Sequence, residues 1–218
     1  NEIMLPEQLF ERVVEIDERV RADGCVERLL YIAACRPAIE QARADGIDAV
    51  AIVFMHAWKY PDHEKAVAKV CRKLGFGQVS VSHEVSPLIK LVGRGDTTVV
   101  DAYLSPILSR YVQSVAGELG ISPTRGEISQ SPRLMFMMSS GGLTAADMFQ
   151  GKDALLSGPA GGVVGMVETA RLAGFDKVIG FDMGGTSTDV AHYDGEYERA
   201  FDTEVAGVRI RAPMMRIH

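Results

Sequence analysis

The sequence FDMGGTSTDV, residues 181–190, places two glycines and three hydroxyl residues between two aspartates. The apolar run before it, residues 178–181, predicts a buried strand, and residues 189–193 predict a second strand. The dipeptide Asp194-Gly195 is a hairpin signal, and residues 197–205 can supply a third strand. The glycines are therefore expected in a tight turn between two strands, not between a strand and a helix.

This turn has the composition of a phosphate site. Gly184 and Gly185 can adopt positive φ and leave backbone N–H groups uncovered, and such groups form a nest that binds anions. Asp182 and Asp189 carry hard oxygen ligands of the kind that hold hydrated Mg²⁺ beside phosphates. A hairpin whose hydroxyls only satisfy backbone groups is the simpler alternative, and the two flanking acids argue against it. No helix follows, so the turn fits neither a Walker A loop nor a dinucleotide fingerprint.

Composition sets the class of protein. The chain has 218 residues, 47% hydrophobic and 24% charged, as in ordinary globular proteins. Its net charge of −6 argues against a nucleic-acid surface and against charge-driven binding to an anionic membrane. No apolar run reaches the length of a membrane span, and the N-terminus lacks a signal-peptide pattern. Cys25, Cys35 and Cys71 have no metal-ligand spacing, which predicts free thiols in a reducing cytoplasm.

The rest of the chain alternates predicted helices and strands. Helices are predicted at residues 6–14, 37–44, 61–74, 97–117 and 157–172, and strands at residues 47–56, 78–82, 133–138 and 207–211. Asp96 or Thr97 is the expected cap of the helix at residues 97–117, and Thr144 is expected to start a short helix. Residues 20–30 are ambiguous, and residues 121–132 predict an exposed connection. The alternation before residue 82 predicts parallel strands, and therefore an α/β fold.

Two further glycine-rich stretches allow more than one interpretation. In SGPAGGVVG, Ser157 can cap a helix whose N-terminus faces an anion, with Gly158, Gly161 and Gly162 near the ligand. Alternatively, Gly161, Gly162 and Gly165 let two backbones approach closely. The stretch SSGG, residues 139–142, ends a strand where ligands of parallel sheets collect, and it either meets substrate or only turns the chain.

The string FDMGGTSTDV, preceded by LLSGPAGGVVG, resembles the hydantoinase/5-oxoprolinase family, within the sugar kinase, heat-shock 70 and actin superfamily of ATPases. The segments DAYLSPILSRYV, MSSGGL and FDTEVAGVRIRAP resemble the same family, so the resemblance covers most of residues 45–213. It implies two ribonuclease H-like lobes, each a mixed sheet with flanking helices, that clamp ATP and Mg²⁺. Each lobe would contribute one phosphate-binding hairpin.

The resemblance also implies roles for single residues. Gly184, Gly185 and Thr186 would donate to the phosphates, with Ser187 and Thr188 in the same cofactor-binding turn. As the catalytic residue, Asp182 would hold Mg²⁺ through water or orient an attacking group. Asp189 would support the loop or the water shell of the metal. Such groups stabilise the charge of a transferring phosphoryl group. The helix after Ser157 resembles an inter-lobe connection, which favours packing over direct contact with ATP.

The chain is expected to be an internal piece of a larger polypeptide. It begins without Met at Asn1 and ends at His218 without a tail, and the family's first-lobe hairpin and adenosine-binding segment are not found in it. Residues 1–175 would be the remainder of the first lobe with its connecting helix, and residues 176–218 the start of the second. The isolated piece is expected to be inactive.

The function implied by the resemblance is ATP-dependent hydrolysis of a cyclic amide. ATP would phosphorylate the amide oxygen of 5-oxoproline or a hydantoin, so that water can open the ring. An ATP-using subunit of an acetone- or acetophenone-type carboxylase is the alternative enzyme, and a structural or interaction domain is the alternative outside catalysis. The expected partners are the small cyclic amide, the remainder of the polypeptide and a second hydantoinase-type subunit, in the cytoplasm.

Overall fold

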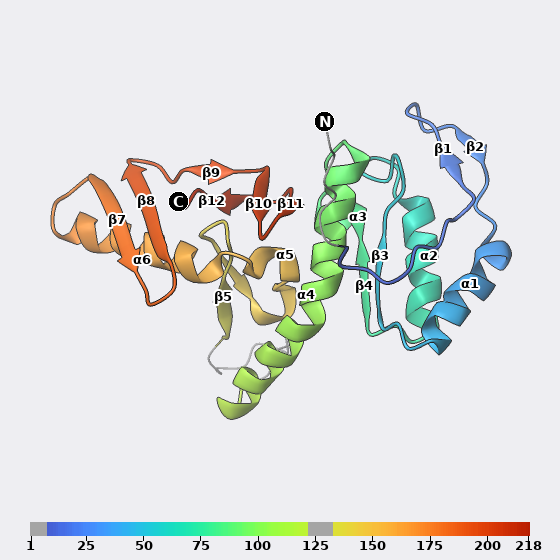
Figure 1. The fold of residues 1–218 in the computed structure, drawn as a ribbon, viewed down its shortest axis with the longest axis horizontal. Helices are drawn as coiled ribbons and strands as arrows, with labels where there is room; N and C mark the ends of the chain where they lie inside the picture. The colour runs from blue at the N-terminus through green and yellow to red at the C-terminus, as the bar shows by residue number, and fades with distance from the viewer. Residues whose placement is uncertain (1–7, 122–132) are drawn as a thin grey trace. The chain divides into compact units, whose positions relative to one another are not determined.

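The computed structural model describes residues 8–121 and 133–218 of the chain (Figure 1). These residues separate into two compact units. The first comprises the described residues up to Ile107 together with Glu204–Arg211, and the second comprises Leu108–Thr203 with Ala212–His218. Helices and strands are mixed in the fold, so the predicted α/β class is confirmed. The expected domain boundary after residue 175 lies inside the second unit. The exposed connection is predicted at residues 121–132, and all of these except residue 121 are outside the described residues.

Two parallel strands form the centre of the first unit. Strands β3 and β4 pair in parallel, and helix α2 connects them, as the alternation predicts (Figure 1). Helices α1 and α2 pack Ile39, Val67 and Cys71 against Ile52 and Val81 of these strands in one apolar core. The elements of this unit are β1 (Arg19–Val20), β2 (Val26–Arg28), α1 (Ile32–Ala44), β3 (Ala49–Ile52), α2 (Asp62–Lys73), β4 (Gln78–Val81), α3 (Ser82–Val85) and β11 (Val208–Ile210).

Helix α2 shows why the local prediction succeeds. Pro61 precedes it, and Asp62 and Glu64 occupy its first turn, where carboxylates interact favourably with the helix dipole. Its last turn carries Arg72 and Lys73, which suits the opposite end of the dipole. Gly75 follows with a φ of +80°, a conformation that ends helices at little cost only for glycine.

The long helix α4 (Leu91–Glu118) begins earlier than expected. Asp96 and Thr97 lie inside it, so the prediction that one of them caps the helix is wrong. The hydroxyls of Thr97 and Thr98 instead donate to the carbonyls of Gly93 and Arg94, one turn back, at 2.8 and 2.7 Å. A threonine satisfied in this way can stay within a helix, and its sequence signature is the same as that of a cap.

Other boundaries also differ from the sequence prediction. Residues 8–14 form no regular structure, so the described part of the first predicted helix is absent. Helix α1 starts at Ile32 and contains Pro37 in its interior, although proline favours the first turn. Residues 53–56 leave the predicted strand, because β3 ends at Ile52. Thr144 lies in a strand, not at a helix start.

The second unit is built on two antiparallel hairpins and one helix. Each Gly-Gly turn of the sequence belongs to a hairpin, β5 with β6 and β7 with β8. Helix α6 packs on the second hairpin, with Ala160, Val163, Ala191 and Met215 in the shared core. The elements are β5 (Met135–Met137), β6 (Leu143–Ala145), η1 (Ala146–Met148), α5 (Gly151–Ala154), α6 (Ser157–Leu172), β7 (Lys177–Met183), β8 (Thr188–Asp194), β9 (Arg199–Ala200) and β12 (Met214–Met215). Strand β10 (Thr203–Val205) lies mostly in the first unit, where it pairs with β11.

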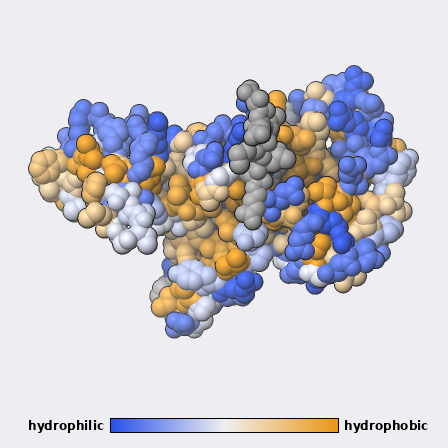
Figure 2. Space-filling model, viewed as in Figure 1, coloured by the Kyte–Doolittle hydropathy of each residue, from blue (hydrophilic) through white to orange (hydrophobic). Residues whose placement is uncertain are grey.

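One face of β7 carries exposed apolar side chains. Ile179, Phe181 and Met183 alternate along the strand and are 75%, 68% and 72% exposed. The region of β7 and α6 shows hydrophobic colour on the surface in Figure 2. Among the helices in the described ranges, none combines the length and apolarity needed to span a membrane.

Candidate functional site

The β7–β8 hairpin forms the turn that the sequence predicts. The strands pair in antiparallel register, with Asp182 opposite Asp189 and Met183 opposite Thr188. The loop between them is Gly184 to Ser187, and the N–H of Gly184 donates to the carbonyl of Ser187 at 2.9 Å. Directly opposed residues of an antiparallel pair place their side chains on the same face of the sheet. The hairpin therefore brings the two aspartates together.

The two glycines of the loop do not act as expected. Neither Gly184 nor Gly185 adopts positive φ, so the prediction that the turn uses this conformational freedom is wrong. The N–H of Gly184 is occupied within the hairpin, and a Cβ on this residue would lie 3.6 Å from the Ser187 carbonyl oxygen. Within the described ranges, no residue accepts a hydrogen bond from the N–H of Gly185 or Thr186. Of the three N–H groups that the sequence analysis assigns to phosphate, those of Gly185 and Thr186 are therefore still available to an anion.

A pocket of about 370 Å³ lies between α6 and the hairpin. This volume falls at the lower end of the range for small-molecule sites. Asp182 is exposed and Asp189 half-buried, so both carboxylates are accessible from the pocket. The lining residues are Pro159, Gly162, Val163, Met166, Gly180, Phe181, Asp182, Asp189, Ala191 and Ile217.

The start of α6 differs from the sequence prediction in its cap residue. Leu156 is the N-cap residue and Ser157 the first helical residue, and no side chain of the cap bonds the helix, so the prediction that Ser157 is the cap is wrong. A Cβ on Gly162 or Gly165 would meet no described atom within 4 Å, so these glycines do not admit a second described backbone. Gly162 lines the pocket, whereas Ser157, Gly158 and Gly161 do not.

The far end of α6 is fixed to the hairpin. The guanidinium of Arg171 lies over the ring of Tyr193, 5.4 Å from its centroid, and donates to the Tyr193 hydroxyl. That hydroxyl donates in turn to the carbonyl of Gly195 at 2.8 Å. Since Tyr193 is buried, the C-terminal end of α6 and strand β8 form one packed unit beside the pocket.

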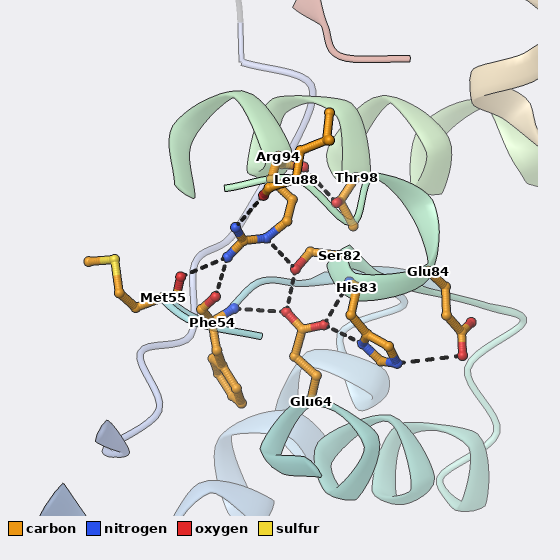
Figure 3. Close-up of polar contacts among 9 residues, drawn as sticks. All are labelled: Phe54, Met55, Glu64, Ser82, His83, Glu84, Leu88, Arg94 and Thr98. Atoms are coloured by element: carbon orange, nitrogen blue, oxygen red, sulfur yellow. Dashed lines mark hydrogen bonds and ion pairs between the residues drawn. The ribbon is translucent and has the colours of Figure 1, made fainter. Parts of the chain in front are cut away.

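A buried polar network in the first unit was missed by the sequence analysis (Figure 3). Glu64 accepts from the N–H of Phe54 at 2.9 Å, from the N–H of His83 at 3.1 Å and from its ring at 2.7 Å, with Nδ1 assigned as the donor. Arg94 donates to the carbonyls of Phe54, Met55 and Leu88.

Ser82 joins the two charged residues of this network. Its hydroxyl donates to Glu64 and accepts from Nε of Arg94 at 2.9 Å. The network follows the carboxyl ends of β3 and β4, where ligands of parallel sheets collect. Glu64, Ser82 and Arg94 are 0% exposed, so the network holds loops together instead of binding a ligand from solvent. Polar residues directly after the buried strand β4 are the only sequence signal that could have indicated it.

Comparison with known proteins identifies close relatives in sequence and fold. Residues 94–218 match the hydantoinase/oxoprolinase family model, and residues 1–75 match the model of the hydantoinase/oxoprolinase N-terminal region. The 5-oxoprolinase of Saccharomyces cerevisiae is 37% identical over 243 residues, which cover 96% of this chain and 18% of the relative. The chain thus spans about a fifth of the length of this curated relative.

Structures show the same relationship. The alpha subunit of caprolactamase from Pseudomonas jessenii is 35% identical over 93% of this chain and 29% of its own length. The crystal structure of ATP-dependent caprolactamase from that organism matches with a TM-score of 0.78 and 34% identity, over 94% of this chain and 29% of that one. A nucleotide-free acetone carboxylase structure has a TM-score of 0.77, covers 93% of this chain and 29% of that one, and is 23% identical, which shows a shared fold. Since a family model matches more than half of its residues, the chain belongs to the hydantoinase/oxoprolinase family.

Proposed function

We propose that this chain is the part of an ATP-dependent cyclic-amide hydrolase that carries one of its phosphate-binding hairpins. The observation that carries the proposal is the pocket in which Asp182 and Asp189 oppose Gly162 of α6. The two carboxylates face the first turns of α6, where the small residue Gly162 leaves room for a phosphate chain and its metal. The names of the relatives, 5-oxoprolinase and ATP-dependent caprolactamase, support the same chemistry.

The donor set fits ATP with Mg²⁺. In nucleotide sites, Mg²⁺ keeps several waters and is held by one or two carboxylates together with phosphate oxygens. Asp182 and Asp189, opposite each other in the hairpin, would supply those carboxylates, and Asp182 is also the residue proposed to orient an attacking group. The N–H groups of Gly185 and Thr186, with the hydroxyls of Thr186, Ser187 and Thr188, supply donors for phosphate oxygens. Gly184 closes the turn, because its N–H donates to the Ser187 carbonyl. A bound Mg²⁺ would neutralise part of the phosphate charge.

The reaction needs these groups because an amide is a poor electrophile. Transfer of the terminal phosphoryl group of ATP to the amide oxygen makes the amide carbon a better electrophile and releases ADP. Water then adds to that carbon, the C–N bond breaks so that the ring opens to an amine and an acyl phosphate, and a second water hydrolyses the acyl phosphate to carboxylate and phosphate. The hairpin binds the nucleotide phosphates and stabilises the charge that develops during transfer. Ser157, Gly158 and Gly161 stay candidates for nucleotide contact because they precede Gly162 on α6, although they lie outside the pocket lining.

The finer assignment of the fold is also a proposal. Residues 176–218 would begin a second ribonuclease H-like lobe, and residues 1–175 would complete a first lobe with α6 as the connection. An antiparallel hairpin that directly follows a long helix supports this assignment. A partner subunit is proposed because the caprolactamase relative is an alpha subunit. The free thiols Cys25, Cys35 and Cys71 support a cytoplasmic location.

The test is an activity assay on the complete polypeptide purified with any subunit that accompanies it. ADP formation is measured with 5-oxoproline, a hydantoin, caprolactam, or acetone with bicarbonate. A cyclic amide is expected to stimulate ADP formation, with one ring opened for each ATP used. Stimulation only by ketone and bicarbonate would establish the carboxylase alternative, with which the acetone carboxylase structure shares its fold. A protein that neither binds nor hydrolyses ATP would support a structural or interaction domain.

A further inference from the structure

Ser139 holds the junction that precedes α6. It lies two residues after the end of β5, in the turn of residues 139–142, and is 1% exposed. Its N–H and its hydroxyl both donate to the carbonyl of Asp153, each at 2.7 Å. The hydroxyl also accepts the N–H of Leu156, the N-cap residue of α6, at 2.9 Å. One buried serine therefore satisfies polar groups on both sides of the α5–α6 junction.

Helix α6 has no side-chain cap, and Ser139 supplies an acceptor for the N–H of its N-cap residue. The side chain of Leu156 cannot bond a helix N–H, and no other side chain caps the first turn. Leu156 is half-buried, and an unsatisfied N–H that is shielded from water costs free energy, so an outside acceptor matters there. The opposite end of α6 is fixed by Arg171 and Tyr193. The N-terminal end, which carries Pro159 and Gly162 of the pocket, depends on Ser139.

The backbone of Ser139 also contacts the C-terminal segment, which lines the pocket through Ile217. Its carbonyl accepts the N–H of Met215 at 2.7 Å. Two residues farther along, Ile217 lines the pocket, and His218 exchanges two backbone hydrogen bonds with Val190 of β8, at 2.7 and 2.9 Å. Ser139 therefore connects α6 to the C-terminal segment, and that segment connects to the hairpin of Asp182 and Asp189.

We propose that Ser139 is a positioning residue for the pocket, where its hydroxyl sets the distance of the N-terminal end of α6 from the β7–β8 hairpin. The proposal rests on the function proposed above, in which that gap receives the phosphates of ATP. Ser139 does not line the pocket, and its hydroxyl is already used as donor and acceptor, so it acts through α6 and not on the substrate. For Ser139, these bonds favour the interpretation in which the SSGG stretch turns the chain.

The experiment compares Ser139→Ala with wild type in the complete polypeptide. Removing the hydroxyl releases the Leu156 N–H but leaves the Met215 bond, which uses the backbone. We expect KM for ATP to rise about tenfold, because misplaced binding groups lose affinity, while KM for the cyclic amide stays within about twofold. Ser140→Ala, in the same turn, is the matched control, since the Ser140 carbonyl and not its hydroxyl bonds Arg199. This control is expected to keep the wild-type KM.

The outcomes separate this inference from the proposed function. If wild type shows no ATP-dependent ring opening, the proposed function fails. If wild type is active and Ser139→Ala melts at a lower temperature with KM for ATP unchanged, Ser139 is only structural and the inference is overturned. Should Ser139→Ala not fold, Ser139→Cys retains a weaker donor and acceptor. It is expected to show an intermediate rise in KM for ATP, and an unchanged KM in that variant overturns the inference.

Discussion

Glu64 and Arg94, both fully buried, are joined through the hydroxyl of Ser82, which donates to the carboxylate and accepts from the guanidinium (Figure 3). Burial lowers the pKa of Arg94, and the negative charge of Glu64 opposes that shift. Each charge compensates the other in a region without solvent. The pair also ties the loop after β3 to the first turns of α2 and α4, and through Ser82 it contacts the start of α3.

Replacing Glu64 by Ala is expected to destabilise the protein by about 3–5 kcal/mol, because the change leaves a buried positive charge without its partner. It also leaves the N–H groups of Phe54 and His83 without their acceptor. Urea denaturation followed by circular dichroism measures the loss. Glu40→Ala is the control, since Glu40 pairs with Arg36 at the surface and such pairs contribute at most about 1 kcal/mol. Equal losses in both variants would contradict the role of the network.

Gly141 and Gly165 are predicted to respond to alanine in opposite directions. Gly141 has a φ of +83°, and a Cβ there would lie 2.0 Å from Cε of the buried Met215, so Gly141→Ala is expected to cost about 1–2 kcal/mol or more. Gly165 lies within α6 with open space around it, so Gly165→Ala is expected to stabilise by about 0.5–1 kcal/mol. Thermal unfolding of both variants checks this. A large loss at Gly165 would restore the interpretation that the α6 glycines admit another backbone.

The parts of the fold that were predicted from sequence are those whose signal is local. The hairpin of residues 181–190 and helix α2 each contain their own pattern, turn and end residues within a short stretch. The parts that were missed depend on partners distant in sequence. Ser139 bonds Leu156 across 17 positions, and Arg94 bonds Phe54 across 40. A side chain that bonds a distant element produces no periodic pattern in the sequence, so these contacts could not be predicted from sequence patterns.

The same reasoning explains the errors in the predicted site. Two glycines in a turn signal conformational freedom, but a four-residue loop closed by the Gly184 N–H to the Ser187 carbonyl does not require positive φ. Ser157 has the sequence of a helix cap, but the helix begins at it, and the accepting oxygen comes from Ser139. Whether a serine caps a helix depends on where the chain turns, and tertiary contacts determine that point.

Asp182→Asn is expected to lower kcat of the complete polypeptide at least about 100-fold, the usual effect of losing a group that stabilises transition-state charge. The fold should persist, since Asp182 is exposed. Asp194→Asn is the matched control. Asp194 lies at the other end of the same hairpin, where it pairs with the exposed Lys177 at 2.6 Å. Near-normal turnover in Asp182→Asn, with ring opening measured directly, would remove the assigned role.

Asp189→Asn is expected to raise the Mg²⁺ concentration needed for half-maximal activity about tenfold, while excess Mg²⁺ restores most of the turnover. The reason is that a neutral amide attracts the hydrated cation less than a carboxylate does. The measurement is a titration of EDTA-treated protein with Mg²⁺ at saturating ATP. An unchanged half-maximal concentration would show that Asp189 supports the loop and not the metal.

The three thiols are expected to differ in reactivity toward iodoacetamide at pH 8. Cys25 is exposed, whereas Cys35 and Cys71 are buried in the core of the first unit. Burial raises the pKa of Cys71 to about 11, with a smaller contribution from Cys35, so about one molecule in a thousand carries the reactive thiolate at Cys71 at this pH. Mass spectrometry should show one rapid alkylation per chain in native buffer and three in urea. Rapid labelling of Cys71 in native buffer would mean that the α1–α2 core opens on the timescale of alkylation, because a closed core leaves neither the access nor the thiolate that the reaction requires.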